Sequence, residues 1–138
     1  MLKYMLRFVV LLHETPPAYP RTTHFDLMLE RGDVLWTWAL ERLPEAGQAV
    51  MAERLPDHRP MYLDYEGEVA GSRGRVSRLE AGEFEVVFDA EARLVVLLRG
   101  KTLCGTLALE RLESEPHRWR ISLTPGEANS SLPGSSVR

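Results

Sequence analysis

The sequence has little cysteine, no long apolar run and no excess of basic residues. Cys104 is the single cysteine among 138 residues, which excludes an internal disulfide and favours a reducing compartment such as the cytoplasm. No stretch approaches the roughly 18 apolar residues that a membrane-spanning helix needs. Arg7 interrupts the apolar N-terminal run and no small-residue cleavage site follows, so we expect neither a signal peptide nor a membrane segment.

The charge balance excludes a protein that is basic over its whole surface. The formal net charge is -3 and the sequence pI is about 5.8. Contact with a nucleic acid therefore has to come from a local basic patch or from a bound metal ion. The length, with 44% hydrophobic and 27% charged residues, is typical of one soluble globular domain.

Short apolar and alternating segments predict a protein made mostly of strands. Residues 24–30 alternate, with Phe25 and Leu27 on one face and His24 and Asp26 on the other, and a Gly-Asp turn leads into residues 34–40. Residues 48–55 fit a short helix or a strand equally well. Further strands are expected at residues 4–12, 73–79, 83–88, 93–98, 102–111 and 119–123, with a turn at Gly82.

Many short strands with little helix predict an all-β fold, a compact barrel that is closed or partly open. We assign residues 1–123 to this domain. Residues 124–138 are rich in Pro, Gly and Ser and are expected to form a disordered tail.

A His-x-Asp pattern at His24 and Asp26 is the first candidate for chemistry. Residues i and i+2 of a strand point the same way, so an imidazole and a carboxylate can converge on one ion. His13 ends the preceding strand and supplies a third ligand if the two strands are neighbours. Two imidazoles and a carboxylate suit Mn, Fe or Zn better than Ca or Mg. The alternative interpretation is a solvated polar face without a metal.

A second candidate cluster lies in residues 57–67, D-H-R-P-M-Y-L-D-Y-E-G. His58 offers a proton donor and Tyr62 a hydrogen-bond donor for an anionic group. Arg73 and Arg75 can hold a phosphate through charge-assisted hydrogen bonds. Each of these residues, taken singly, is also typical of an ordinary exposed surface.

Five motifs, in order, resemble the 3′-phosphoesterase domain of bacterial DNA ligase D and its short stand-alone relatives. The family pattern is F-V-V-x-x-H, H-Y-D-F-R-L-E, x-x-W-A-x-P-K, D-H-P-x-x-Y-x-x-F-E-G and G-K-x-L-x-G. The corresponding segments here are F-V-V-L-L-H at 8–13, H-F-D-L-M-L-E at 24–30, W-A-L-E-R at 38–42, the cluster at 57–67 and G-K-T-L-C-G at 100–105.

The resemblance implies a metal-dependent phosphoesterase that removes a 3′-phosphate or a 3′-ribonucleotide from a DNA end during end joining. It implies that His13, His24 and Asp26 bind manganese, and that His58 and Tyr62 contact the scissile phosphate. Arg42 stands where the family has a lysine and is expected, like Arg73 and Arg75, to bind phosphate. The implied fold is a small β-barrel with the site at one mouth, and the implied partners are nucleic-acid 3′ ends and a separate DNA ligase or end-joining protein.

Two features depart from the family pattern. Met28 stands where the family has an arginine that grips phosphate, and loss of such a donor costs on the order of 1.5–3 kcal/mol in binding. The loop from Glu14 to Thr23 is longer and rich in proline. These departures leave a second hypothesis open, namely a metal-containing barrel that binds DNA ends, nucleotides or a repair partner without turnover.

Overall fold

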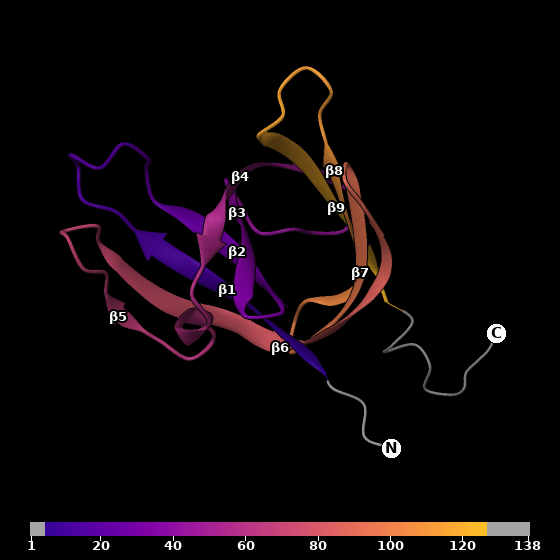
Figure 1. Cartoon of the computed structure of the whole chain (residues 1–138), viewed down its shortest axis with the longest axis horizontal. Coiled ribbons are helices and arrows are strands. Elements are labelled where there is room, and N and C mark those ends of the chain that lie inside the picture. The colour runs from indigo at the N-terminus through magenta and orange to yellow at the C-terminus, as the bar shows by residue number, and fades with distance from the viewer. Residues whose placement is uncertain (1–4, 127–138) are drawn as a thin grey trace.

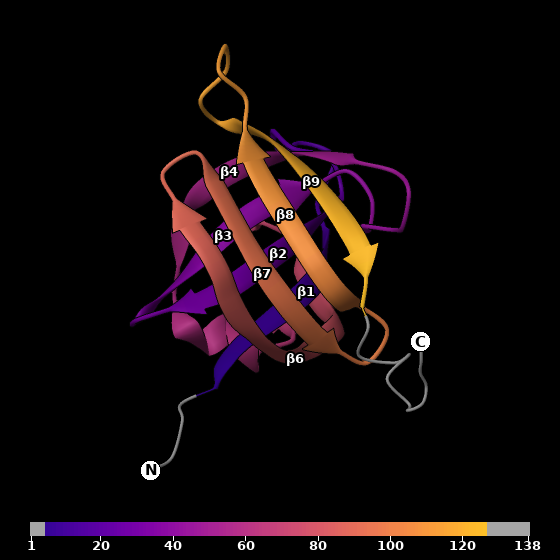
Figure 2. The ribbon, with the colours of Figure 1, turned by 90° about the vertical axis from the view of Figure 1, so that its right-hand side faces the viewer.

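An antiparallel sheet that closes on itself forms the body of the protein. The computed structural model describes residues 5–126 and contains, within that range, nine strands and one short 3-10 helix. Eight strands pair in the order β1-β2-β3-β4-β9-β8-β7-β6, and β6 pairs back with β1 to close a barrel. Figure 2 shows β6–β9 crossing in front of β1–β4. The predicted all-β barrel is confirmed.

The element bounds are as follows. The strands are β1 (Leu6–Glu14), β2 (His24–Arg31), β3 (Val34–Leu40), β4 (Val50–His58), β5 (Gly67–Glu68), β6 (Arg75–Ala90), β7 (Arg93–Gly100), β8 (Cys104–Arg111) and β9 (Arg118–Pro125), and the helix is η1 (Pro60–Leu63).

Alternation along each strand fills the barrel interior. Alternate side chains point inward, and apolar residues occupy these positions because their burial removes hydrocarbon from water. All eight barrel strands contribute to this core, which includes Phe8, Val10, Leu27, Leu29, Trp38, Leu40, Val50, Phe84, Val96, Leu107, Leu109, Trp119 and Ile121.

Gly82 does not form the turn that the sequence predicted. Residues 75–90 are one continuous strand, and Gly82 lies inside it opposite Gly100. A Cβ atom at Gly82 would stand 2.3 Å from the carbonyl oxygen of Arg99, so glycine permits the close approach of β6 and β7. The ambiguous segment at 48–55 is strand β4.

The described part of the chain begins just before β1 and ends just after β9. Strand β9 continues through Pro125, two residues into the predicted tail, whereas residues 127–138 lie outside the described range. The first described strand runs from Leu6 to Glu14, and Tyr4, where the sequence predicted its start, lies outside the described residues. No helix within residues 5–126 is long and apolar enough to cross a bilayer.

Residues 59–74 form an outer layer on one flank of the barrel. Figure 1 shows η1 and β5 outside the barrel wall, beside β1 and β6. Leu63 and Val69 of this segment pack on outward-facing side chains of β1 and β2, among them Leu11 and Met28, in a second apolar cluster. The outer layer therefore buries the apolar part of the outer face of β1 and β2, and the candidate site lies at the polar end of the same face.

Candidate metal centre

His13, His24 and Asp26 lie on the outer face of the barrel wall. They follow the alternation of β1 and β2 that turns Phe8, Val10 and Leu27 inward, so their own side chains point out. The resemblance implied a site at one mouth of the barrel, whereas these side chains point away from the barrel interior. The cluster sits near one end of the barrel but outside it, between the wall and the outer layer.

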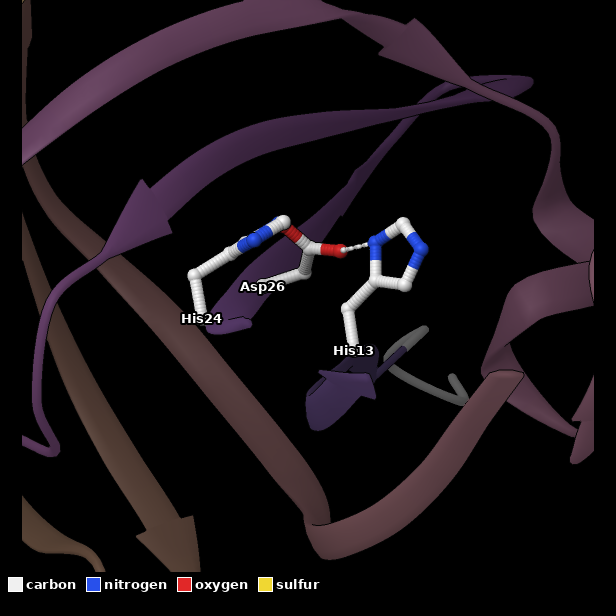
Figure 3. Close-up of side chains that lie close together, drawn as sticks. All are labelled: His13, His24 and Asp26. Carbon is white, nitrogen blue, oxygen red and sulfur yellow. Dashed lines mark ion pairs between the residues drawn. The ribbon is translucent and has the colours of Figure 1, made fainter. Parts of the chain in front are cut away.

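The strand register brings the three residues together. His13 pairs directly with His24 across β1 and β2, and Asp26 follows two residues later on the same face. Nδ1 of His13 lies 3.4 Å from Oδ2 of Asp26, and Nε2 of His24 lies 3.0 Å from Oδ1 (Figure 3). One ligand atom from each residue lies within 4.8 Å of the others. The predicted convergence is confirmed.

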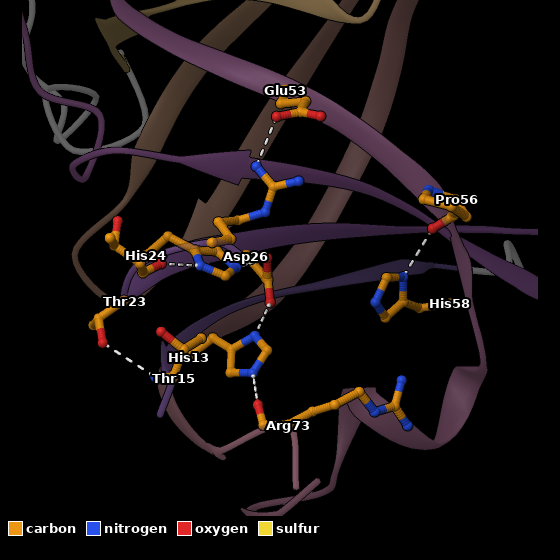
Figure 4. Close-up of polar contacts among 11 residues, drawn as sticks. His13, Thr15, Thr23, His24, Asp26, Glu53, Pro56, His58 and Arg73 are labelled. Atoms are coloured by element: carbon orange, nitrogen blue, oxygen red, sulfur yellow. Dashed lines mark hydrogen bonds and ion pairs between the residues drawn. The ribbon is translucent and has the colours of Figure 1, made fainter. Parts of the chain in front are cut away.

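Backbone carbonyl groups hold both imidazole rings from behind. Nε2 of His13 lies 2.7 Å from the carbonyl oxygen of Arg73, and Nδ1 of His24 lies 2.8 Å from that of Thr22 (Figure 4). A carbonyl oxygen only accepts hydrogen bonds, so each of these nitrogens carries the proton. In the neutral rings, the nitrogen that faces Asp26 is then left with a lone pair.

Gly74 allows the chain to reach His13 from behind. Its φ is +99°, and a Cβ atom there would stand 2.0 Å from the carbonyl oxygen of Glu14. Only glycine can place the backbone so close to the end of β1 in this conformation. The preceding residue, Arg73, is thereby positioned to accept the hydrogen bond from His13.

Asp26 is a buried carboxylate with unused acceptor capacity. Its side chain is 4% exposed, and among the described residues no hydrogen bond reaches the buried Oδ1 atom. Burial acts to raise the pKa of Asp26, but the two neighbouring imidazoles outweigh it and hold the pKa below its usual value. The same carboxylate raises the pKa of His13 above 6.5, against the effect of burial.

This donor set fits a divalent transition-metal ion. Ligands bound at about 2.1 Å from one ion stand roughly 3.0–3.4 Å apart. The two nitrogen–oxygen separations at Asp26, one at each carboxylate oxygen, fall in this range, and one ligand atom from each of the three residues lies within 4.8 Å of the others. Carbonyl groups behind the rings are the usual support of histidine ligands. A cation would also contact Oδ1 of Asp26, which lies 3.0 Å from Nε2 of His24 but receives no hydrogen bond.

A cleft of about 460 Å³ opens over the three residues, and we call it the histidine cleft. His58 and Tyr62 line its far side, and their rings meet edge to face with centroids 5.8 Å apart. Nδ1 of His58 lies 2.8 Å from the carbonyl oxygen of Pro56, so Nε2 is the nitrogen left for other chemistry (Figure 4). The structure thus joins the two candidate clusters in one cavity.

The predicted arginines separate into one that lines this cleft and two that do not. Arg73 lines it, with Nε donating to the carbonyl oxygen of Ala70 at 2.6 Å. Arg75 lies on the rim of another depression, and Arg42 donates to the carbonyl oxygen of Ala49 at 3.1 Å. The geometry supports a phosphate-binding role for Arg73 alone among the three.

Sequence reasoning missed two cleft residues in the proline-rich loop. Tyr19 and Arg21 both line the histidine cleft, and the ring of Tyr19 lies 5.7 Å from that of His13. Nη1 of Arg21 lies 2.7 Å from Oε1 of Glu53, which anchors the loop to β4. The only sequence signal was a basic residue three positions before His24, too weak to single out. Arg59, at the start of the outer layer, also lines the cleft.

Met28 lies on the cleft wall at the position of the family's arginine. It is 1% exposed and packs among Leu11, Leu35 and Leu63. The methionine thus fills an apolar space beside Asp26 and offers no hydrogen-bond donor to a ligand. The longer loop does not separate the histidines, because His13 and His24 remain directly paired.

Comparison with known proteins gives one family. The sequence model of the DNA Ligase D 3′-phosphoesterase domain matches residues 18–114, which is more than two thirds of the chain. No curated protein matches the sequence. The matched range contains Arg21, His24, Asp26 and His58, whereas His13 precedes it.

Proposed function

Because the chain belongs to the DNA ligase D 3′-phosphoesterase domain family, we propose that it is a metal-dependent phosphoesterase acting on nucleic-acid 3′ ends. The observation that carries the proposal is the convergence of His13, His24 and Asp26 on the floor of the histidine cleft, with both rings oriented by carbonyl groups. Manganese is the proposed ion, with zinc or iron as alternatives. We propose removal of a 3′-phosphate or a 3′-ribonucleotide.

A divalent ion held by these three residues supplies positive charge that polarises a phosphate ester. The chain itself has to attract the anionic group, and Arg59 and Arg73 place positive charge around the cleft, whereas the charge of Arg21 is balanced by Glu53. Tyr62 is in position to donate its hydroxyl hydrogen to a phosphate oxygen. The hydrophobic wall at Met28 excludes water from one side.

His58 is the proposed general acid. Its Nδ1–H is engaged by Pro56, so the imidazolium form can deliver the proton of Nε2 to the 3′ oxygen. In the overall step a water oxygen bonds to phosphorus, the bond between phosphorus and the 3′ oxygen breaks, and the released hydroxyl takes this proton. His58 is on the opposite side of the cleft from the metal ligands, which suits a leaving-group role.

The test is release of inorganic phosphate from a primer–template that carries a 3′-phosphate, in the presence of manganese. We expect release by the native protein and a loss of at least about 100-fold in His24→Ala, because a ligand is removed. His117→Ala is a matched control, since this histidine lies outside the histidine cleft. No release by the native protein, or equal release by His24→Ala, contradicts the proposal.

Met28 favours a second candidate function, a barrel that binds DNA ends without turnover. The buried methionine leaves that wall of the cleft without the donor that the family uses. Metal-dependent binding of DNA that bears a 3′-phosphate, without any product, would support this candidate over the enzyme. A separate ligase or end-joining protein as partner, and the cytoplasm as location, are further proposals.

A further inference from the structure

A second cleft lies at the end of the barrel, and we call it the tryptophan cleft. It encloses about 300 Å³ and is lined by Trp36 and Trp38 of β3, Arg54 of β4, Trp119 of β9 and the hairpin between β6 and β7. These three tryptophans are all that the chain contains. The proposed phosphoesterase uses none of them.

Two arginines stack on the indole rings. Cζ of Arg31 lies 4.5 Å from the ring centroid of Trp36, and Cζ of Arg54 lies 4.7 Å from that of Trp38. Trp38 and Trp119 meet edge to face with centroids 5.5 Å apart. The five side chains therefore form one contiguous cluster of flat groups.

Four buried donors in this cluster have no acceptor. Among residues 5–126, the buried donor atoms without a hydrogen-bond partner are Nε1 of Trp38, Nε1 of Trp119, Nε of Arg54 and Nη1 of Arg31. An unsatisfied buried donor costs on the order of 1–3 kcal/mol. Three of the four donors belong to residues that line the cleft, Trp38, Trp119 and Arg54, so the cleft calls for an acceptor. The only other buried side-chain atom without a hydrogen bond in that range is Oδ1 of Asp26, which is ion-paired with His24.

The charge around the cluster favours an uncharged ligand. Arg31 is paired with Asp89 at 2.9 Å and Arg54 with Asp57 at 3.2 Å, so each guanidinium charge is already balanced. Asp89 and Glu91 also line the cleft and would repel an anion. The charges are thus paired, but the buried N–H donors beside the indole rings still lack a hydrogen-bond acceptor, and an uncharged acceptor would serve.

We propose that the tryptophan cleft binds a nucleobase, either free or within a single strand. A nucleobase is flat and uncharged, it stacks on indole rings, and its carbonyl oxygens and ring nitrogens are acceptors for the donors of Trp38, Trp119 and Arg54. The carboxylate of Asp89 on the rim can accept from an exocyclic amino group.

This site is distinct from the histidine cleft. The two clefts share no lining residue, and the ion pair between Arg54 of the tryptophan cleft and Asp57 of the histidine cleft, at 3.2 Å, connects them. The inference does not depend on the proposed phosphoesterase activity, and its test needs neither metal nor turnover.

The chain provides its own reporter, because every tryptophan lines the cleft. We would titrate the whole protein with adenosine, with a short single-stranded deoxyoligonucleotide bearing a 3′-hydroxyl, and with inorganic phosphate, and follow tryptophan fluorescence. Saturable quenching by adenosine supports a free-base site, and quenching by the oligonucleotide alone supports a site for a strand. Phosphate should give no quenching. No quenching by either nucleobase ligand, or equal quenching by phosphate, overturns the proposal.

Nuclear magnetic resonance gives a second readout that does not depend on any variant. The chain has three indole N–H signals, and those of Trp38 and Trp119 should shift on binding as their protons gain an acceptor. Unchanged indole signals at saturating nucleobase ligand overturn the proposal.

A pair of variants tests the guanidinium donor. Arg54→Lys keeps the charge but loses Nε and the flat stacking group. We expect the dissociation constant for the nucleobase ligand to increase at least tenfold. Arg99→Lys is the matched control, because Arg99 is an exposed arginine paired with Glu85 and lies outside this cleft. Equal weakening in both variants, or no weakening in Arg54→Lys, overturns the assignment of Arg54.

Discussion

Nδ1 of His13 lies 3.4 Å from Oδ2 of Asp26, although the two residues belong to different strands and a nine-residue loop separates those strands. The register of β1 and β2 sets this distance, since His13 pairs with His24 and the aspartate follows at i+2. A shift of one residue would turn every one of these side chains into the apolar core. The candidate metal centre is thus encoded by the same alternation that builds the barrel.

Removing the carboxylate should abolish metal binding without unfolding the barrel. Asp26→Asn keeps the shape but loses the charge that two imidazoles and an ion share, so we expect manganese affinity to fall at least about 100-fold. Isothermal titration calorimetry measures the affinity, and circular dichroism checks the fold. His58→Ala should bind manganese like the native protein and lose phosphate release. Full metal affinity in Asp26→Asn contradicts the assigned ligand set.

Protons should compete with the metal at His13. Asp26 raises the pKa of His13 above its ordinary 6.5, so the metal-free ring holds a proton at that pH and above. A ligand nitrogen has to lose its proton, so manganese affinity should rise as the pH rises through and beyond 6.5. Calorimetry in buffers of different ionisation enthalpy should detect proton release on binding. An affinity that stays constant between about pH 5.5 and 8 contradicts this prediction.

Met28→Arg tests whether the missing donor limits activity. The substitution places a long charged side chain in an apolar wall, so we expect the free energy of unfolding to drop by about 1–3 kcal/mol. The guanidinium can extend into the adjoining cleft, and phosphate release should increase. Met28→Leu is the control, with little effect on either quantity. A folded Met28→Arg protein with no gain in release argues that another part of the cleft limits turnover.

Glu80 should be important for stability and not for the site. Its buried carboxylate points into the barrel and accepts hydrogen bonds from the amides of Thr102 at 2.7 Å and Leu103 at 2.6 Å. Glu80→Ala leaves these donors unpaired, and we expect a loss of about 2–4 kcal/mol in urea unfolding. Glu83→Ala, on the outward face of the same strand, should change stability by less than about 0.5 kcal/mol. Equal effects would contradict the assigned role.

The sequence predicts the parts of this molecule that depend on alternation. The hairpin of β2 and β3 and the shared face of His24 and Asp26 follow directly from a period of two. The turn predicted at Gly82 was wrong because glycine occurs both in turns and where two strands approach closely. The contact with the backbone of Arg99, which shows that the second case applies here, cannot be read from the sequence. Residues 48–55 stayed ambiguous because Pro56 and the bulge beside Leu35 distort the end of that strand.

The position of the site depends on contacts that are distant along the chain. Whether His13 faces a barrel mouth or the outer wall is fixed by closure of β1 on β6 and by residues 59–74 packing over the wall. The carbonyl groups that orient the histidines come from loops without a sequence signature. Arg21 reaches the cleft only because its loop folds back and pairs with Glu53.

A crystal structure of the protein loaded with manganese, with anomalous diffraction data, tests the central claim most directly. The account predicts one strong anomalous peak at bonding distance, about 2.1–2.3 Å, from Nδ1 of His13, Nε2 of His24 and a carboxylate oxygen of Asp26. A loaded crystal without a peak between these three side chains, or with the ion bound elsewhere in the molecule, would contradict it.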